Sequence, residues 1–100
     1  MVVLHSLAGC RRQPEHTDYD PVRLRGLAVK PCGVLFALQE DTSLHVEGAR
    51  IELSAGDALV FTGDTVHSGA GYGRDNTRIH VYLDTDTVCR ERNTTFLTGE

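Results

Sequence analysis

Long hydrophobic runs are missing from this chain of 100 residues. None approaches the roughly 18 apolar residues that a membrane-spanning helix needs, so we expect no membrane segment. Residues 1–7 are mostly apolar but are interrupted by His5 and carry no basic leader. They therefore lack the pattern of a signal peptide.

Paired cysteines and a strong basic cluster are missing as well. The three cysteines, Cys10, Cys32 and Cys89, never form a Cys-x-x-Cys motif. Their odd number argues against a disulfide framework, and their spacing argues against a zinc ribbon. Free thiols are typical of a reducing compartment, so we expect a cytoplasmic protein. The net charge of −4 makes nucleic acid an unfavourable partner.

A helical apolar period is also absent, because no window of about 11 or more residues repeats every 3.6 residues. Turn residues instead recur about every 8–12 residues, which is typical of an all-β domain. By its length the chain is one domain, residues 1–100. The expected strands cover residues 2–7, 22–29, 33–38, 44–46, 50–53, 58–61 and 77–83, with a hairpin at 44–53. The apolar pair at 96–97 is either an edge strand or part of a frayed tail.

Two histidines and an aspartate are the candidate metal ligands. His16 and Asp18 are separated by one residue, so in an extended segment both side chains point to the same side. His67 follows a strand and a Gly63-Asp64 turn, which places its imidazole at the mouth of a β-barrel. Each feature alone is common in proteins, the first as a surface turn and the second as a rim histidine. Together they match the two-histidine, one-carboxylate triad of non-haem Fe(II) sites.

The predicted strand at 77–83 alternates in character. Ile79, Val81 and Leu83 fall on one face, and Arg78, His80 and Tyr82 fall on the other. If the apolar face packs outward, Arg78 points into the barrel, where a buried guanidinium needs an anionic partner. The carboxylate of a small organic acid would bind it in a bidentate manner. The alternative is an outward arginine on a solvated face.

In this order, the residues resemble the Fe(II)/2-oxoglutarate-dependent oxygenases, most of all the phytanoyl-CoA-hydroxylase-like and prolyl-hydroxylase-like branches. The matching residues are His16-Thr17-Asp18, Gly56-Asp57 with Phe61, His67-Ser68-Gly69, Asn76 and Arg78. The resemblance implies a double-stranded β-helix, a cupin-like jelly roll, here reduced to a minimal core with little or no helix.

The resemblance also implies the chemistry. His16, Asp18 and His67 would be the catalytic Fe(II) ligands, and Arg78 would hold the distal carboxylate of the cosubstrate 2-oxoglutarate. Ser68 and Asn76 are candidates for orienting the ligands, while Tyr82 and His80 could line the pocket. Such a dioxygenase uses O₂ to hydroxylate a small-molecule or protein substrate and releases succinate and CO₂.

Family members usually carry helices ahead of the barrel, and this chain has almost nothing before His16. It is either a minimal core, the core of a longer protein, or a subunit of a homodimer whose partner covers the exposed sheet. Two other functions stay open. One is a cupin-type metal protein that does not use 2-oxoglutarate, although the usual His-x-His is missing ahead of Gly56. The other is a catalytically inactive jelly-roll binding module.

Overall fold

Alternating side chains and frequent turn residues fold this chain almost entirely into short β-strands. The computed structural model describes residues 1–98. Its elements are β1 (Val2–Ser6), β2 (His16–Thr17), α1 (Pro21–Leu24), β3 (Cys32–Ala37), β4 (Thr42–Val46), β5 (Ala49–Leu53), β6 (Ala58–Thr62), β7 (His67–Gly69), β8 (Asn76–Leu83) and β9 (Phe96–Leu97). No helix among these residues is both long and apolar enough to cross a membrane.

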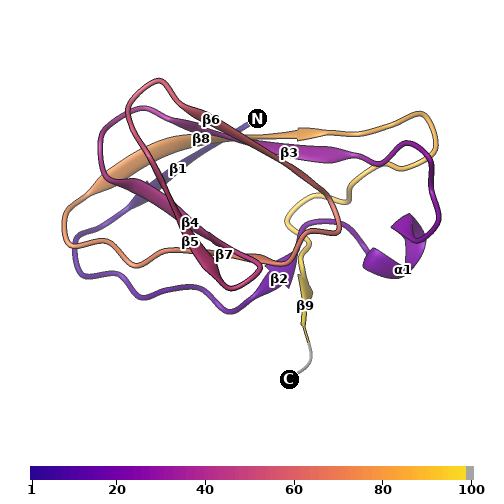
Figure 1. The fold of residues 1–100 in the computed structure, drawn as a ribbon, viewed down its shortest axis with the longest axis horizontal. Coiled ribbons are helices and arrows are strands. Elements are labelled where there is room, and N and C mark those ends of the chain that lie inside the picture. The colour runs from indigo at the N-terminus through magenta and orange to yellow at the C-terminus, as the bar shows by residue number, and fades with distance from the viewer. Residues whose placement is uncertain (99–100) are drawn as a thin grey trace.

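The strands form two facing antiparallel sheets (Figure 1). One has four strands in the order β1-β8-β3-β6, and the other has five in the order β5-β4-β7-β2-β9. Apart from the β4–β5 hairpin, successive strands lie in opposite sheets, so the chain repeatedly crosses between them, as in a jelly roll. The predicted all-β jelly roll with almost no helix is confirmed.

The predicted hairpin between residues 44 and 53 is confirmed as β4 and β5. Val46 pairs with Ala49, so only two residues form the turn. Glu47 and Gly48 both have positive φ, at 47° and 85°. This is the backbone of a two-residue turn whose twist matches the flanking strands, and the glycine adopts it without steric cost.

The interior between the sheets has an apolar part and a polar part. The apolar part is a cluster of buried side chains from both sheets: Leu35, Ala37, Leu44, Leu53 and Phe61. The polar part comes largely from β8, where Asn76, Arg78 and His80 face inward and are buried. The alternation predicted for this strand therefore holds, and it turns Arg78 into the sandwich rather than toward solvent.

The strand predicted for residues 22–29 is wrong, because α1 occupies its start. The Asp20 carboxylate accepts a hydrogen bond from the Val22 N–H at 3.0 Å and caps the helix, and Pro21 is its first residue. Aspartate at the cap and proline at the first helical position are the usual start of a helix. Leu24 is fully buried and forms a second small core with Tyr19 and Val88.

Candidate metal centre

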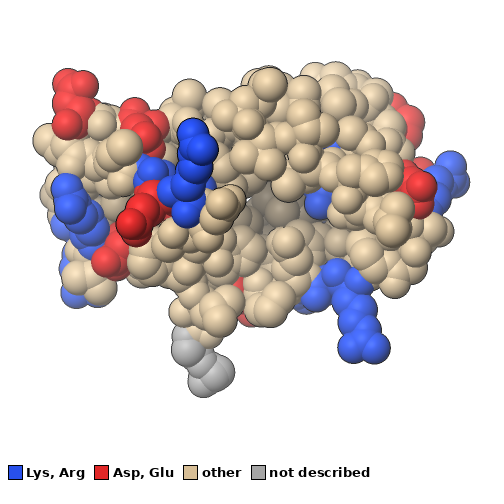
Figure 2. Space-filling view, turned by 180° about the vertical axis from the view of Figure 1, so that it is seen from behind, with Lys and Arg blue, Asp and Glu red and all other residues tan. Residues whose placement is uncertain are grey.

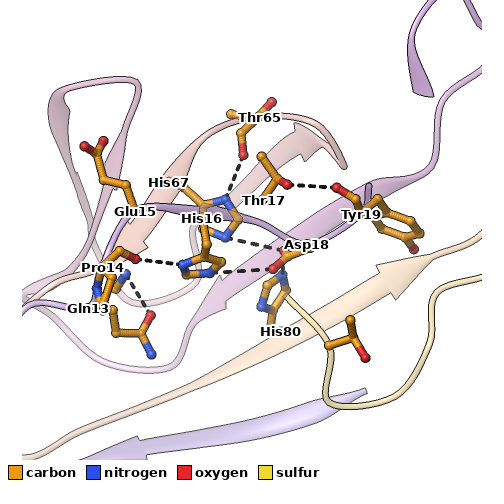
Figure 3. A network of polar contacts seen from close by, with 12 residues as sticks. Gln13, Pro14, Glu15, His16, Thr17, Asp18, Tyr19, Thr65, His67 and His80 are labelled. Atoms are coloured by element: carbon orange, nitrogen blue, oxygen red, sulfur yellow. Dashed lines mark hydrogen bonds and ion pairs between the residues drawn. The ribbon is translucent and has the colours of Figure 1, made fainter. Parts of the chain in front are cut away.

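His16 and His67 are brought together by strand pairing. β2 and β7 are neighbours in the five-stranded sheet, and His16 pairs directly with His67. Their imidazole centroids lie 4.5 Å apart. Asp18 follows β2 directly, two residues after His16, and its side chain turns toward the same point (Figure 3). The structure therefore brings together the three residues that the sequence singled out.

The distances within this cluster suit a shared metal ion. His67 Nε2 lies 3.4 Å from Oδ2 of Asp18, and His16 Nε2 lies 3.7 Å from Oδ1. One candidate ligand atom from each of the three residues lies within 4.8 Å of those from the other two. Asp18 and His67 are only 2% and 3% exposed. The cluster thus offers two imidazoles and one carboxylate at a single buried point.

Backbone carbonyls hold both imidazoles in place. Nδ1 of His16 lies 2.9 Å from the Pro14 carbonyl oxygen, and Nδ1 of His67 lies 2.9 Å from that of Thr65. A carbonyl can only accept, so each Nδ1 carries the proton and donates. Each Nε2 is then the nitrogen left to bind a metal beside Asp18, and such a carbonyl contact at Nδ1 is the usual outer support of a metal-bound histidine.

The charges in the cluster are coupled. Burial alone would raise the pKa of Asp18, but its electrostatic interactions with the neighbouring histidines, His67 above all, outweigh burial and lower that pKa. Burial alone would lower the pKa of His67, but Asp18 raises it above its usual value. For His80, burial lowers the pKa to about 4, so its imidazole is neutral near pH 7.

The donor set of the triad fits a metal, and two unpartnered polar atoms lie at the same buried point. Oδ2 of Asp18 and Nε2 of His80 are buried and have no hydrogen-bond partner among the described residues. Such groups normally find a partner, because an unmet polar atom in the interior costs free energy. A divalent cation bound by Asp18 would remove the unmet charge. Imidazole and carboxylate ligands suit Fe(II) and other divalent transition metals.

His80 is the residue of the centre that sequence reasoning undervalued. It projects inward from β8, is 7% exposed, and places its Nε2 3.5 Å from Oδ2 of Asp18. The alternation of residues 77–83 placed it on the same face as Arg78 and Tyr82, but left open whether that face points inward. No sequence signal gives the distance from β8 to Asp18, because the two lie in opposite sheets.

A cavity of about 130 Å³ connects the cluster with Arg78. Its wall is formed by Leu4, Gln13, His16, Asp18, Leu35, Leu44, Phe61, His67, Gly69, Arg78, His80, Tyr82 and Thr95. Arg78 is 6% exposed, and its guanidinium lies 5.0 Å from the centre of the Tyr72 ring. The triad and the predicted anion-binding arginine therefore share one small cavity.

Of the three other predicted site residues, Tyr82 lines this cavity, whereas Asn76 and Ser68 do not. Tyr82 lines it and packs on His80, with ring centroids 4.3 Å apart. Asn76 donates a hydrogen bond to Thr42 Oγ1 at 3.0 Å, and its Oδ1 accepts from Arg78 at 3.4 Å. The Ser68 hydroxyl accepts from Arg12 Nε at 3.0 Å. The imidazoles of the triad are held by Pro14 and Thr65 instead.

Arg90 was not identified from the sequence, and it fixes the C-terminal segment beside the centre. Its guanidinium lies 3.8 Å from the centre of the Tyr82 ring. It also donates hydrogen bonds to the carbonyl oxygens of Asp18 and Thr94, at 3.1 and 2.7 Å. A surface-type arginine in a polar tail carries no local pattern that predicts such a role.

Known structures share this architecture. No protein-family model matches the sequence, and no curated protein matches it. A cupin protein from Bacteroides fragilis superimposes with a TM-score of 0.62 at 16% identity, covering 89% of this chain and 68% of that one. The DMSP lyase DddQ from Ruegeria pomeroyi DSS-3 gives a TM-score of 0.65 at 20% identity. That match covers 98% of this chain and 43% of the lyase, so the chain spans less than half of the lyase's length.

At these identities the likeness establishes the fold. The chain has a cupin-like jelly-roll fold with a candidate His-Asp-His metal centre inside it.

Proposed function

We propose that this protein is a non-haem Fe(II)- and 2-oxoglutarate-dependent dioxygenase. The observation that supports 2-oxoglutarate as the cosubstrate is the burial of the Arg78 side chain without a carboxylate partner in the described part of the chain. Its guanidinium is buried but has no carboxylate partner among residues 1–98. Its hydrogen bonds go to Ser6 Oγ at 3.0 Å and to the backbone and side-chain oxygens of Asn76 at 3.5 and 3.4 Å.

A buried guanidinium without a counterion is costly, and a carboxylate is its best-matched partner. The triad and Arg78 line the same cavity, so an anion of suitable length held by Arg78 would have its other end near a metal held by the triad. A small dicarboxylic 2-oxo acid has the two ends that this arrangement requires. Its distal carboxylate would be held by Arg78 and its 2-oxo acid end would reach the metal.

The reaction that fits consumes substrate, 2-oxoglutarate and O₂, and yields hydroxylated substrate, succinate and CO₂. Bound Fe(II) would supply the means of activating O₂, and His16, Asp18 and His67 would hold it. The chain's own part is to orient the cosubstrate and exclude water, the latter through Leu35 and Phe61 in the cavity wall. We assign the reaction to the cytoplasm, because all three cysteines are free thiols.

Arg78→Met tests this proposal. The Mn(II)-loaded chain is titrated with 2-oxoglutarate in a calorimeter, and succinate formation is followed with Fe(II), O₂ and ascorbate. Removing one partner of a buried charge pair costs about 2–5 kcal/mol, so we expect 2-oxoglutarate affinity to fall at least roughly 30-fold. Mn(II) affinity should not change, since Arg78 is not a ligand.

Arg74→Met is the matched control, because that side chain is 82% exposed. It should bind 2-oxoglutarate like the wild type. If the metal-loaded wild type binds no 2-oxoglutarate, or if Arg78→Met binds it equally well, the proposal is wrong.

A cupin-type metal protein that does not use 2-oxoglutarate is the second candidate. It is favoured by the likeness to two cupin-fold structures, one of them a lyase. The same titration separates the two, because this second function requires tight metal binding without any 2-oxoglutarate binding.

A further inference from the structure

His80 differs from the two other histidines of the centre. The Nδ1 atoms of His16 and His67 are each held by a backbone carbonyl oxygen at 2.9 Å. His80 has no such hydrogen bond among the described contacts, and its Nε2 is buried without a partner. No contact among the described residues therefore holds the His80 proton on Nδ1, which is the tautomer that would leave the Nε2 lone pair available to a metal. Nε2 of His80 is free to carry the proton.

The atom opposite His80 is the matching acceptor. Oδ2 of Asp18 is also buried and unpartnered, and it lies 3.5 Å from His80 Nε2. This separation is slightly longer than the roughly 2.8 Å of a charge-assisted N–H···O bond, so a small movement would close it. In Figure 3, His16 and His67 lie to the left of Asp18, and His80 lies below it.

Packing, not hydrogen bonding, holds the His80 ring in this place. The ring lies beside Phe61 and Tyr82, with centroid separations of 5.8 and 4.3 Å. Gly33 on the neighbouring strand β3 leaves the necessary room, because a Cβ there would lie 3.0 Å from His80 Nε2. The fold therefore reserves a position for this imidazole against the carboxylate.

We propose that His80 is a positioning residue that donates its Nε2–H to Oδ2 of Asp18, so that Asp18 binds the metal through a single oxygen. A carboxylate that is free to turn can bind through both oxygens and occupy an additional position on the metal. Hydrogen bonds to ligating carboxylates are the usual way in which proteins restrict this. The inference rests on metal binding by the triad, and it does not depend on 2-oxoglutarate.

Variants of His80 test the donor role through metal affinity, measured with Mn(II) in the absence of 2-oxoglutarate. His80→Phe keeps the aromatic packing but removes the donor, and we expect Mn(II) affinity to fall roughly 10- to 100-fold. His80→Gln restores an N–H at a similar reach and should recover most of the loss. His5→Phe, at a side chain that is 52% exposed, is the matched control and should bind like the wild type.

A measurement on the wild type tests the same idea without any variant. In the ¹⁵N NMR spectrum of the Zn(II)-loaded chain, Nε2 of His80 should carry a proton. Nε2 of His16 and Nε2 of His67 should instead be metal-bound and without a proton. A metal-bound, unprotonated Nε2 in His80 would make it a fourth ligand and overturn the inference.

The other possible results also decide whether His80 acts as a donor. Unchanged Mn(II) affinity in a folded His80→Phe, or equal losses in His80→Phe and His80→Gln, would exclude the donor role. If the wild type binds no metal, this inference and the proposed function both fail. If it binds metal with the expected His80 dependence but binds no 2-oxoglutarate, only the proposed function fails.

Discussion

The side chains of His16 and His67 are oriented before any metal arrives. Each has its Nδ1 held by a backbone carbonyl, and each directs its Nε2 toward the same buried carboxylate. Such an arrangement is set up during folding, so little ordering is left for the binding step. In return, the charge of Asp18 is buried, and its side-chain neighbours are the imidazoles of His16, His67 and His80.

Replacing His67 with alanine should abolish specific metal binding. The loss of this ligand should exceed the roughly 10- to 100-fold that follows from removing a group that only supports a ligand. Calorimetric titration with Mn(II) measures it, and His45→Ala, a histidine outside the cavity wall, serves as control. Equal affinity in His67→Ala and the wild type would remove His67 from the centre.

Gly33→Ala should disturb the same centre from the opposite sheet. The new Cβ would lie 3.0 Å from His80 Nε2 and 3.1 Å from the Phe61 ring. We expect a loss of about 1–3 kcal/mol in the free energy of unfolding, as for other insertions into a packed interior. Urea unfolding followed by circular dichroism measures it. Gly73→Ala, where a Cβ would meet no heavy atom within 4 Å, should be close to neutral.

The candidate ligands could be predicted from the sequence, but their supporting partners could not. His16 and Asp18 are separated by a single residue, and a short turn positions His67. The spacing and order of these residues along the chain were therefore enough to predict them as ligands. The carbonyl oxygens of Pro14 and Thr65 are backbone atoms that any residue type could supply. His80 meets Asp18 only because two sheets pack face to face, which no local pattern encodes.

Among the elements, the strands were easier to predict than the helix. β8 is long and alternates regularly, so its existence and the division of its residues between two faces could be predicted from the sequence, whereas the direction of each face could not. α1 has only four residues, Pro21–Leu24, too few for an apolar period to show. Its signal is Asp20 followed by Pro21, and this pair also occurs in turns, so it does not identify a helix by itself.

The turn that precedes β7 is held by an ion pair. Lys30 Nζ donates to Oδ2 of Asp64 at 2.8 Å, and the Thr62 hydroxyl donates to Oδ1 at 2.8 Å. Burial alone would raise the pKa of Asp64, but these hydrogen bonds outweigh it and lower that pKa below 3.8. The charged form of Asp64 therefore stabilises the fold at a point three residues before His67.

Asp64→Asn should lower the free energy of unfolding by about 1 kcal/mol at neutral pH. Because the folded-state pKa is the lower one, the stabilisation is complete above the unfolded pKa and disappears as the pH falls through the folded value. The difference between variant and wild type should therefore shrink in acid. Urea unfolding at pH 7 and below 3.8 measures it, with the exposed Asp86→Asn as control. A difference that grows in acid would contradict this account.

For the whole molecule, the two faces of the four-stranded sheet have opposite characters. Its inner face carries the polar wall of the cavity. Its outer face has no Asp, Glu, Lys or Arg at any outward strand position. These positions are Val3, His5, Cys32, Val34, Phe36, Ala58, Val60, Thr62, Thr77, Ile79, Val81 and Leu83. Figure 2 shows charged groups gathered toward the two ends of the molecule, with an uncharged stretch along the top.

This outer face is where we expect the predicted homodimer to form. Val60 and Val3 are 62% and 59% exposed, and a contiguous apolar surface of this kind is typical of an interface. A two-fold axis would bring the face against its own copy, and because it carries no charge the contact has no like-charge repulsion. Sedimentation velocity over a range of concentrations should show a monomer–dimer equilibrium.

Val60→Glu should shift this equilibrium to the monomer, because the dimer would have to bury an unpaired carboxylate. Val29→Glu makes the same exchange at a valine that is 70% exposed and outside the sheets, so it should leave the dimer intact. Both variants should unfold like the wild type as monomers, since each side chain already faces solvent. A wild type that stays monomeric at high concentration, or equal association of the two variants, would exclude this face as the interface.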